Sequence, residues 1–223
     1  KQSNYSISEN LGTLTVTSQS VNPDDPSYRG VRVEAPADVV YNGTSQQQKP
    51  TVTDKDGNVL TEGTDYELSF SEDPTNVGTV TVTVTGKGNY DGSIDVTYKI
   101  TPAPLSVSTA SASKTYDGTP LAKTDGWTLD GLQNGETATV EANGSITEVG
   151  SAKNTYAIAW GSAPASNYEI TSESLGDLSV TAKDITPTDE NGMSVDAPEN
   201  VVYDGKAHQW SPTVADGEKT LAE

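Results

Sequence analysis

The sequence predicts an all-β fold of tandem small modules. The simplest form is an antiparallel, immunoglobulin-like β-sandwich in each module, and a β-grasp-like sheet is the alternative. Three observations carry this prediction. Tyrosine, valine and threonine are abundant while phenylalanine occurs once, a balance that favours pleated strands. Apolar and polar residues alternate in several runs, and no stretch of ten residues carries a helical stripe. Hydrophobic residues make up only 32% of the 223, which favours several small cores over one large core.

The clearest strands lie between residues 66 and 100. In TVTVTVTG the valines alternate with threonines, in SIDVTYKI the residues Ile94, Val96, Tyr98 and Ile100 share one face, and in DYELSF the large side chains again take every second position. The segments between such runs are DKDGN, VGT, GKGN and DGS. Glycine and asparagine reach positive φ at low cost, so these segments predict turns.

An internal repeat sets the domain organisation. NYSISENLGTLTV (4–16) recurs as NYEITSESLGDLSV (167–180), and VEAPADVVYNG (33–43) recurs as VDAPENVVYDG (195–205). Similar proline junctions follow Asn22, Thr101 and Thr186. The repeat predicts the tail of one module (1–21), two complete modules (22–101 and 102–186) and the first part of another (187–223).

A Tyr-(Asp or Asn)-Gly motif occurs at Tyr41, Tyr116 and Tyr203. A structural interpretation makes the ring close one end of a small core, the Asp or Asn cap nearby amides, and the Gly take a left-handed conformation. The competing interpretation is a proton-transfer pair. It lacks a partner, because His208 is the only histidine and its counterpart in the first module is Gln46. We therefore expect an architectural role and no enzymatic activity.

Composition excludes several classes of partner. The net charge is −19, which disfavours binding to nucleic acid and to anionic lipid. The sequence contains no cysteine, so disulfides, thiolate metal sites and thiol catalysis are excluded within this segment. No apolar run is long enough to cross a membrane and no signal peptide is seen. The opening KQSNYSISEN reads as the interior of a longer protein.

Two groups of acidic residues are candidate calcium ligands. Asp54, Asp56 and Asn58 alternate like the start of a calcium loop, but the glycine and the final glutamate of such a loop are missing, so a hairpin turn is the preferred interpretation. The second group lies at the junctions between modules of this acidic chain. There either a bridging ion stiffens the row of modules, or the acids are simply solvated. It consists of Asp24, Asp25, Asp189 and Glu190.

Aromatic residues are the candidate ligand-binding groups, because a tryptophan face can stack on a sugar. The candidates are Trp210, Trp127, Trp160 and Tyr28. Trp160 ends the strand-like YAIAW and Trp127 precedes Leu129 and Leu132, so a core position is the preferred interpretation for these two. Trp210 has Gln48 as its counterpart in the first module. An isopeptide bond from Lys99 or Lys114 is a further alternative, which needs a lysine, an asparagine and an acid buried together.

The first module, with YNG…PTVTDKDGNVLTEGTDYELSF…NVGTVTVTVTGKGNYDGSIDVTYKI, resembles the small β-modules repeated in surface proteins of Gram-positive gut bacteria. The second, with KTYDGTPL…GSITEVGSAKNTYAI…SNYEI…LGDLSV, is similar to companion modules named for their Tyr-Asp-Gly motif. Both are grouped as MBG/YDG-type repeats of adhesins. The resemblance implies an extracellular protein attached to the bacterial cell wall, and it transfers no catalytic residue.

The expected function is therefore a stalk or spacer segment of a bacterial cell-surface adhesin, whose partners are the neighbouring modules of the same chain. The alternative is a module that itself binds host mucin or another glycan. A third, weaker hypothesis is an accessory region of a secreted glycan-degrading enzyme. Neither a nucleic acid nor a membrane is an expected partner, and calcium is the only cofactor for which the sequence offers candidate ligands.

Overall fold

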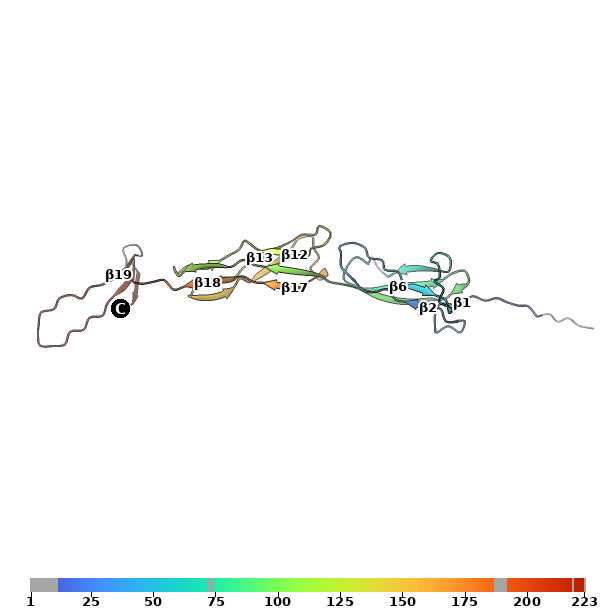
Figure 1. Cartoon of the computed structure of the whole chain (residues 1–223), viewed down its shortest axis with the longest axis horizontal. Coiled ribbons are helices and arrows are strands. Elements are labelled where there is room, and N and C mark those ends of the chain that lie inside the picture. Colours follow the sequence, from blue (N-terminus) through green and yellow to red (C-terminus); the bar gives the residue numbers. More distant parts are fainter. Residues whose placement is uncertain (1–11, 72–73, 187–191, 218, 223) are drawn as a thin grey trace, which may run out of the picture. The chain divides into compact units, whose positions relative to one another are not determined.

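The computed structural model describes residues 12–71, 74–186, 192–217 and 219–222. The chain is almost entirely β, which confirms the predicted class (Figure 1). The only helical element among the described residues is a 3-10 turn, η1 (Ala165–Asn167). The described part contains no helix with the length and hydropathy needed to cross a bilayer.

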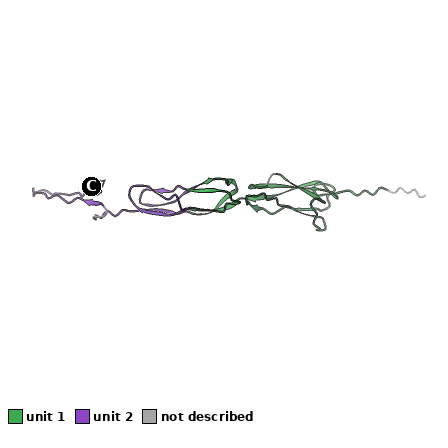
Figure 2. Cartoon of the chain, turned by 90° about the horizontal axis from the view of Figure 1, so that it is seen from above, with its two compact units in different colours: residues 1–108, 128–141, 158–174 green, residues 109–127, 142–157, 175–223 purple. Residues whose placement is uncertain are grey.

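Contacts divide the chain into two compact units (Figure 2). The first comprises residues 1–108, 128–141 and 158–174, and the second comprises 109–127, 142–157 and 175–223. The predicted second module, 102–186, thus contributes to both units. The module boundaries stay a prediction. Residues 1–11 at the start of the predicted 1–21 tail, and residues 187–191 at the start of the predicted 187–223 segment, lie outside the described residues.

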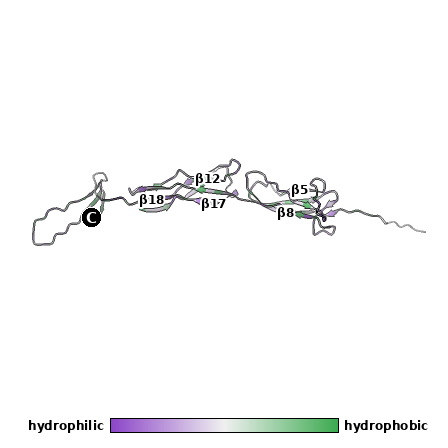
Figure 3. Ribbon diagram, viewed as in Figure 1, coloured by the Kyte–Doolittle hydropathy of each residue, from purple (hydrophilic) through white to green (hydrophobic). Residues whose placement is uncertain are grey.

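The first unit contains a four-stranded sheet in the order β3-β8-β6-β5. Its central strands, β6 (Gly78–Gly86) and β8 (Ser93–Thr101), pair antiparallel with Val82 opposite Val96, and β5 (Tyr66–Phe70) pairs with β6. Val80, Val82 and Val84 are buried between less buried threonines, as the alternation predicts. Hydrophobic stretches lie on β5 and β8 in Figure 3.

Two smaller sheets complete the first module. β2 (Arg32–Glu34) pairs antiparallel with β4 (Thr51–Thr53), and β1 (Gln19–Ser20) pairs in parallel with β7 (Tyr90–Asp91). Val52 of β4 meets Tyr66 and Val84 of the large sheet in one cluster, so apolar side chains of two sheets face each other, as in a sandwich. Val21 belongs to the same cluster and is 1% exposed. Residues 19–21, which the sequence analysis placed in the preceding tail, therefore pack with the first module.

The chain then passes directly into a second sheet of the same unit, with the order β12-β9-β17. β9 (Ala103–Ser108) lies in the middle, antiparallel to β12 (Thr128–Asp130) and parallel to β17 (Tyr168–Ser174). Ala103 and Leu105 of β9 share one cluster with Tyr41, Val82 and Tyr98 of the first module. One hydrophobic core therefore includes residues on both sides of the Thr101–Pro102 junction.

The second unit holds most of the remaining small sheets. β18 (Asp177–Thr181) lies between β10 (Ala112–Thr115) and β15 (Gly150–Lys153), and β11 (Leu121–Ala122) pairs with β14 (Ser145–Ile146). β13 (Ala138–Ala142) pairs with β16 (Tyr156–Trp160), and most residues of this pair belong to the first unit. The last described strands form a separate sheet in the order β19 (Met193–Val195), β20 (Val214–Asp216) and β21 (Lys219–Ala222).

Strand direction is less uniform than the sequence analysis expected. β3 (Val39–Val40) pairs in parallel with β8, and β10 pairs in parallel with β18. A parallel pair needs a long connection between its strands. In both cases the connection is most of a module, because an early strand of the module lies beside its last strand. Local alternation of side chains carries no information on this pairing.

Candidate functional site

The three copies of the Tyr-(Asp or Asn)-Gly motif form the same kind of turn. The side-chain oxygen of Asn42, Asp117 or Asp204 accepts a hydrogen bond of 2.9 Å from the backbone N–H two residues further on. The glycine that follows has a φ of +74°, +79° or +78°. These are the capping and left-handed roles predicted from the sequence, so the structural interpretation of these two residues is confirmed.

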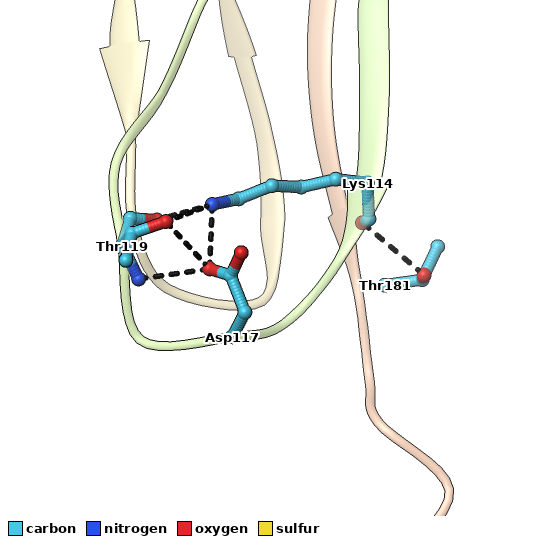
Figure 4. Close-up of polar contacts among 4 residues, drawn as sticks. All are labelled: Lys114, Asp117, Thr119 and Thr181. Carbon is cyan, nitrogen blue, oxygen red and sulfur yellow. Dashed lines mark hydrogen bonds and ion pairs between the residues drawn. The ribbon is translucent and has the colours of Figure 1, made fainter. Parts of the chain in front are cut away.

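The tyrosine of the first two turns marks the end of a parallel strand pair. The backbone N–H of Tyr41 donates to the carbonyl of Thr101, and that of Tyr116 donates to Thr181, each at 2.8 Å. In return the Thr101 hydroxyl donates to Val39 O at 3.2 Å, and the Thr181 hydroxyl donates to Lys114 O at 3.3 Å (Figure 4). The motif therefore stands where β3 leaves β8 and where β10 leaves β18.

In the second copy a lysine closes the turn. Figure 4 shows the Lys114 ammonium reaching across the loop that follows β10, where it donates to Asp117 Oδ1 at 2.6 Å, to Thr119 O at 2.6 Å and to Thr119 Oγ1 at 2.7 Å. These bonds to Lys114 and Thr119 hold the pKa of the Asp117 carboxyl well below its usual range. A carboxylate held ionised in this way is a poor proton carrier near neutral pH, which favours the architectural role.

The first copy forms a polar joint inside the first unit. Tyr41 is 2% exposed, and its hydroxyl donates to Glu136 Oε1 at 2.5 Å. The Tyr168 hydroxyl donates to the other carboxylate oxygen of Glu136 and accepts a 2.9 Å bond from the backbone N–H of Gln133. The two tyrosine rings meet edge to face with centroids 5.5 Å apart, and Trp160 stacks on Tyr168 at 5.9 Å. We call Tyr41, Glu136 and Tyr168 the tyrosine joint.

Two asparagines extend the joint. Asn134 has a φ of +49° and donates from Nδ2 to Gly43 O at 2.9 Å. A Cβ on Gly43 would lie 2.5 Å from Asn134 Cβ, so glycine is needed here for close approach as well as for its φ. Asn167 is 1% exposed; its Oδ1 accepts from the Val77 N–H at 3.0 Å and its Nδ2 donates to Asn76 Oδ1 at 2.8 Å.

Burial and the shared acid change the titration of both phenols. Burial first, and then the hydrogen bond to Glu136, raise the pKa of Tyr41. The same causes raise the pKa of Tyr168 to about 12. A negative phenolate beside a carboxylate in a partly buried site is disfavoured by charge as well as by desolvation. Both hydroxyls therefore remain protonated donors at neutral pH, which keeps the joint closed.

The third copy departs from the prediction. Tyr203 is 90% exposed, so its ring does not close a core. The preceding Val201 and Val202 are exposed as well and belong to none of the described strands, whereas Val39 and Val40 pair with β8. Without that pairing nothing holds the ring against apolar surface. The only histidine, His208, contacts Asp204 at 2.8 Å, four residues away in the same turn.

The calcium candidates that the structure describes lie in turns. Asp54 Oδ1 accepts from the backbone N–H groups of Asp56 and Asn58, and Asp56 pairs with Lys55 at 2.7 Å, so the preferred hairpin turn is confirmed. Asp25 accepts from the N–H and hydroxyl of Ser27, and Asp24 is exposed beside it. Asp189 and Glu190 lie outside the described residues. Among the described residues no three acidic or histidine groups are gathered for a metal, and the calcium hypothesis stays a prediction.

The aromatic candidates have different surroundings. Tyr28 is half-buried against the Val31 cluster and donates its hydroxyl to Val31 O at 2.6 Å. Trp127 is half-buried, and Trp160 packs in the core that contains the tyrosine joint. Trp210 is 47% exposed and lines an open hollow with Asp196, Glu199 and His208. Lys99 is exposed and the Lys114 ammonium is bonded to Asp117 and Thr119, so neither lysine is buried as isopeptide chemistry requires.

Sequence reasoning missed Glu136, Asn134, Asn167 and the role of Tyr168. Each comes from a loop or a strand start that is more than 30 residues from at least one partner, and the segment LQNGETATV reads as an ordinary solvated turn. Nothing in the sequence indicates that these polar residues converge on Tyr41.

No curated protein matches the chain significantly. Residues 101–175 match the family model described as the YDG domain. The match lies almost wholly within the module predicted at 102–186, and it includes Tyr116, Asp117 and Gly118 as well as Glu136 and Tyr168. The chain therefore contains a YDG domain at residues 101–175.

Proposed function

We propose that this segment is a structural spacer of a bacterial cell-surface adhesin, with a mechanical and not a catalytic role. The observation that carries the proposal is the tyrosine joint: Glu136, within the YDG domain, accepts hydrogen bonds from Tyr41 of the preceding module and from Tyr168. A spacer needs limited freedom between consecutive modules. A shared core and a polar joint supply that better than an open linker does.

Charge and cysteine content support the same role. A net charge of −19 keeps an exposed polymer soluble and separated from other anionic surfaces. A β-module without cysteine folds without oxidative help, which suits an exported protein. The resemblance of the repeats to surface-protein modules supports an extracellular location at a Gram-positive cell wall.

The stiffness of the joint can be measured directly. Thr51→Cys and Thr139→Cys place two spin labels at exposed strand positions of the first unit, in a chain that has no other thiol. If the joint is closed, pulsed electron paramagnetic resonance should give one narrow distribution of the distance between the two labels. A broad distribution, unchanged when Tyr41→Phe and Glu136→Gln are added, would contradict the proposal.

The alternative is a module that itself binds mucin or another glycan. The half-exposed Trp210 beside Asp196, Glu199 and His208 favours it, because an aromatic face next to polar groups suits a sugar ring. A panel of mucins and glycans, tested with calcium and with chelator, separates the two functions. Saturable binding that Trp210→Ala abolishes would replace the spacer proposal. Absence of binding to every mucin and glycan, together with a narrow distribution of spin-label distances, supports it.

A further inference from the structure

In each module two early strands pair in parallel with strands near the end of the module. In the first module β1 pairs with β7 and β3 pairs with β8. In the YDG-type module β9 pairs with β17 and β10 pairs with β18. Neighbouring pairs such as β5–β6, β6–β8 and β9–β12 are antiparallel. Parallel pairing therefore joins strands near the start of a module to strands near its end.

This arrangement decides how a module responds to tension. When the chain is pulled at both ends, the first strand is drawn back toward its N-terminus and the last strand forward toward its C-terminus. In a parallel pair these forces act along the strands in opposite senses, so the evenly spaced hydrogen bonds share the load in shear. In an antiparallel pair the two pulled ends would lie together, and the bonds would break one after another.

We propose that these four strand pairs, here called the terminal clamps, make each module resist unfolding by force applied along the chain. The biological sense of this inference rests on the proposed spacer function. Its physical content does not, because it concerns the unfolding barrier in one pulling direction, and forced unfolding is governed by that barrier.

The ends of the clamps are reinforced. Where β3 leaves β8, and where β10 leaves β18, the tyrosine N–H donates to the threonine carbonyl at 2.8 Å. The threonine hydroxyl returns a bond to the first strand, as the Thr181–Lys114 contact in Figure 4 shows. A clamp that begins to open at this end must break these bonds first. The Tyr-(Asp or Asn)-Gly turn thus ends the clamp and turns the chain away.

Burial protects the clamp of the YDG-type module from water. Leu105 and Val107 of β9 are 1% and 2% exposed, and Leu178 and Val180 of β18 are 0% and 2% exposed. Water cannot easily replace a strand hydrogen bond flanked by such side chains. The β9–β17 pair aligns Ala103 to Ser108 and the β10–β18 pair aligns four residues, whereas β1–β7 and β3–β8 each align two. The YDG-type module is therefore the stronger of the two.

Single-molecule pulling of the full chain in two geometries tests the proposal. Because the chain contains no cysteine, thiol handles can be placed at chosen exposed residues. Val16→Cys with Ile185→Cys loads all four clamps in shear; these side chains are 89% and 50% exposed. Thr115→Cys with Ala182→Cys, also at exposed positions, peels β10 from β18 at the end where Thr115 aligns with Thr181.

We expect two unfolding steps in the shear geometry, each releasing up to about 27 nm of chain at roughly 3.4 Å per residue. Both steps require at least about twice the peeling force at the same loading rate, and the step of the YDG-type module occurs at the higher force. Thermal unfolding of both double-cysteine variants checks that the handles leave the fold intact. Equal forces in the two geometries would overturn the clamp, whatever the glycan panel or the label distances show about the spacer.

Discussion

The hydroxyl of Tyr41 donates a 2.5 Å hydrogen bond to the carboxylate of Glu136, which lies 95 residues further along the chain. The bond joins the YNG turn of the first module to the YDG domain that follows it. Its acceptor is charged, and hydrogen bonds to charged groups contribute more than neutral ones. The same carboxylate also accepts from Tyr168, so one acidic side chain holds two tyrosines from different strands.

Tyr41→Phe removes this bond and keeps the ring in the core. We expect the free energy of unfolding in urea to fall by about 1–2 kcal/mol, because a hydrogen bond to a charged group is lost and Glu136 keeps its other donor. Tyr203→Phe is the matched control, since Tyr203 is 90% exposed, and it should leave stability unchanged. Adding Glu136→Gln in a double-mutant cycle should give a coupling energy of about 0.5–2 kcal/mol. Additive effects would mean that the bond contributes nothing.

Alkaline pH should open the joint. The pKa of Tyr168 is raised to about 12 from the ordinary value of 10.0, and the pKa of Tyr41 is raised as well. Since the folded pKa lies above the unfolded one, the stabilisation is complete below pH 10 and is lost as pH rises from 10 toward 12. Melting temperatures measured between pH 8 and 12 should fall across this interval.

Tyr66 and Tyr90 also have raised pKa values through burial, so the decline has several contributors. Tyr168→Phe should therefore flatten the decline without abolishing it. An unaltered slope in that variant would show that Tyr168 is not among the groups that titrate.

The local structure could be predicted from the sequence, because it depends on neighbours along the chain. The alternation of Val80, Val82 and Val84 defines which face of β6 is buried, and the Asp-Gly and Asn-Gly dipeptides define the turns. The direction in which β3 meets β8 could not be predicted. Either direction buries the same alternate side chains, and the choice depends on the path of the intervening 60 or so residues.

The joint could not be predicted for a related reason. Asn134 and Glu136 occupy a polar turn of a kind that is usually solvated, and their contacts with Gly43 and Tyr41 join residues more than 90 positions apart. Tyr203 shows the converse. The same motif in the same sequence context leaves its ring 90% exposed, so the motif specifies the turn, whereas burial of the tyrosine requires the strand beside it.

Calcium should leave thermal stability unchanged. The oxygens of Asp54 already accept from backbone and side-chain donors of its own turn, and Asp25 accepts from Ser27. A cation would have to displace these donors for little gain in an exposed site. Scanning calorimetry in millimolar calcium and in chelator should give melting temperatures within about one degree. A rise of several degrees with calcium would support the bridging-ion hypothesis, and Asp24→Asn, Asp25→Asn and Asp54→Asn would then locate the site.

Two glycines of the repeated motif separate turn strain from close packing at the joint. Gly43 and Gly118 have nearly equal φ values of +74° and +79°. A Cβ at Gly118 would meet nothing within 4 Å, whereas a Cβ at Gly43 would lie 2.5 Å from Asn134 Cβ. Gly118→Ala should therefore cost only the strain of a left-handed alanine, about 1–2 kcal/mol, and Gly43→Ala should cost about 1–3 kcal/mol more, because Asn134 must move.

Urea titrations at equal protein concentration measure both changes. The distribution of spin-label distances between positions 51 and 139 should broaden only in Gly43→Ala. If the two alanine variants are equally destabilised and both keep the narrow distance, the approach of Asn134 to Gly43 does not hold the joint, and the tyrosines and Glu136 must hold it alone.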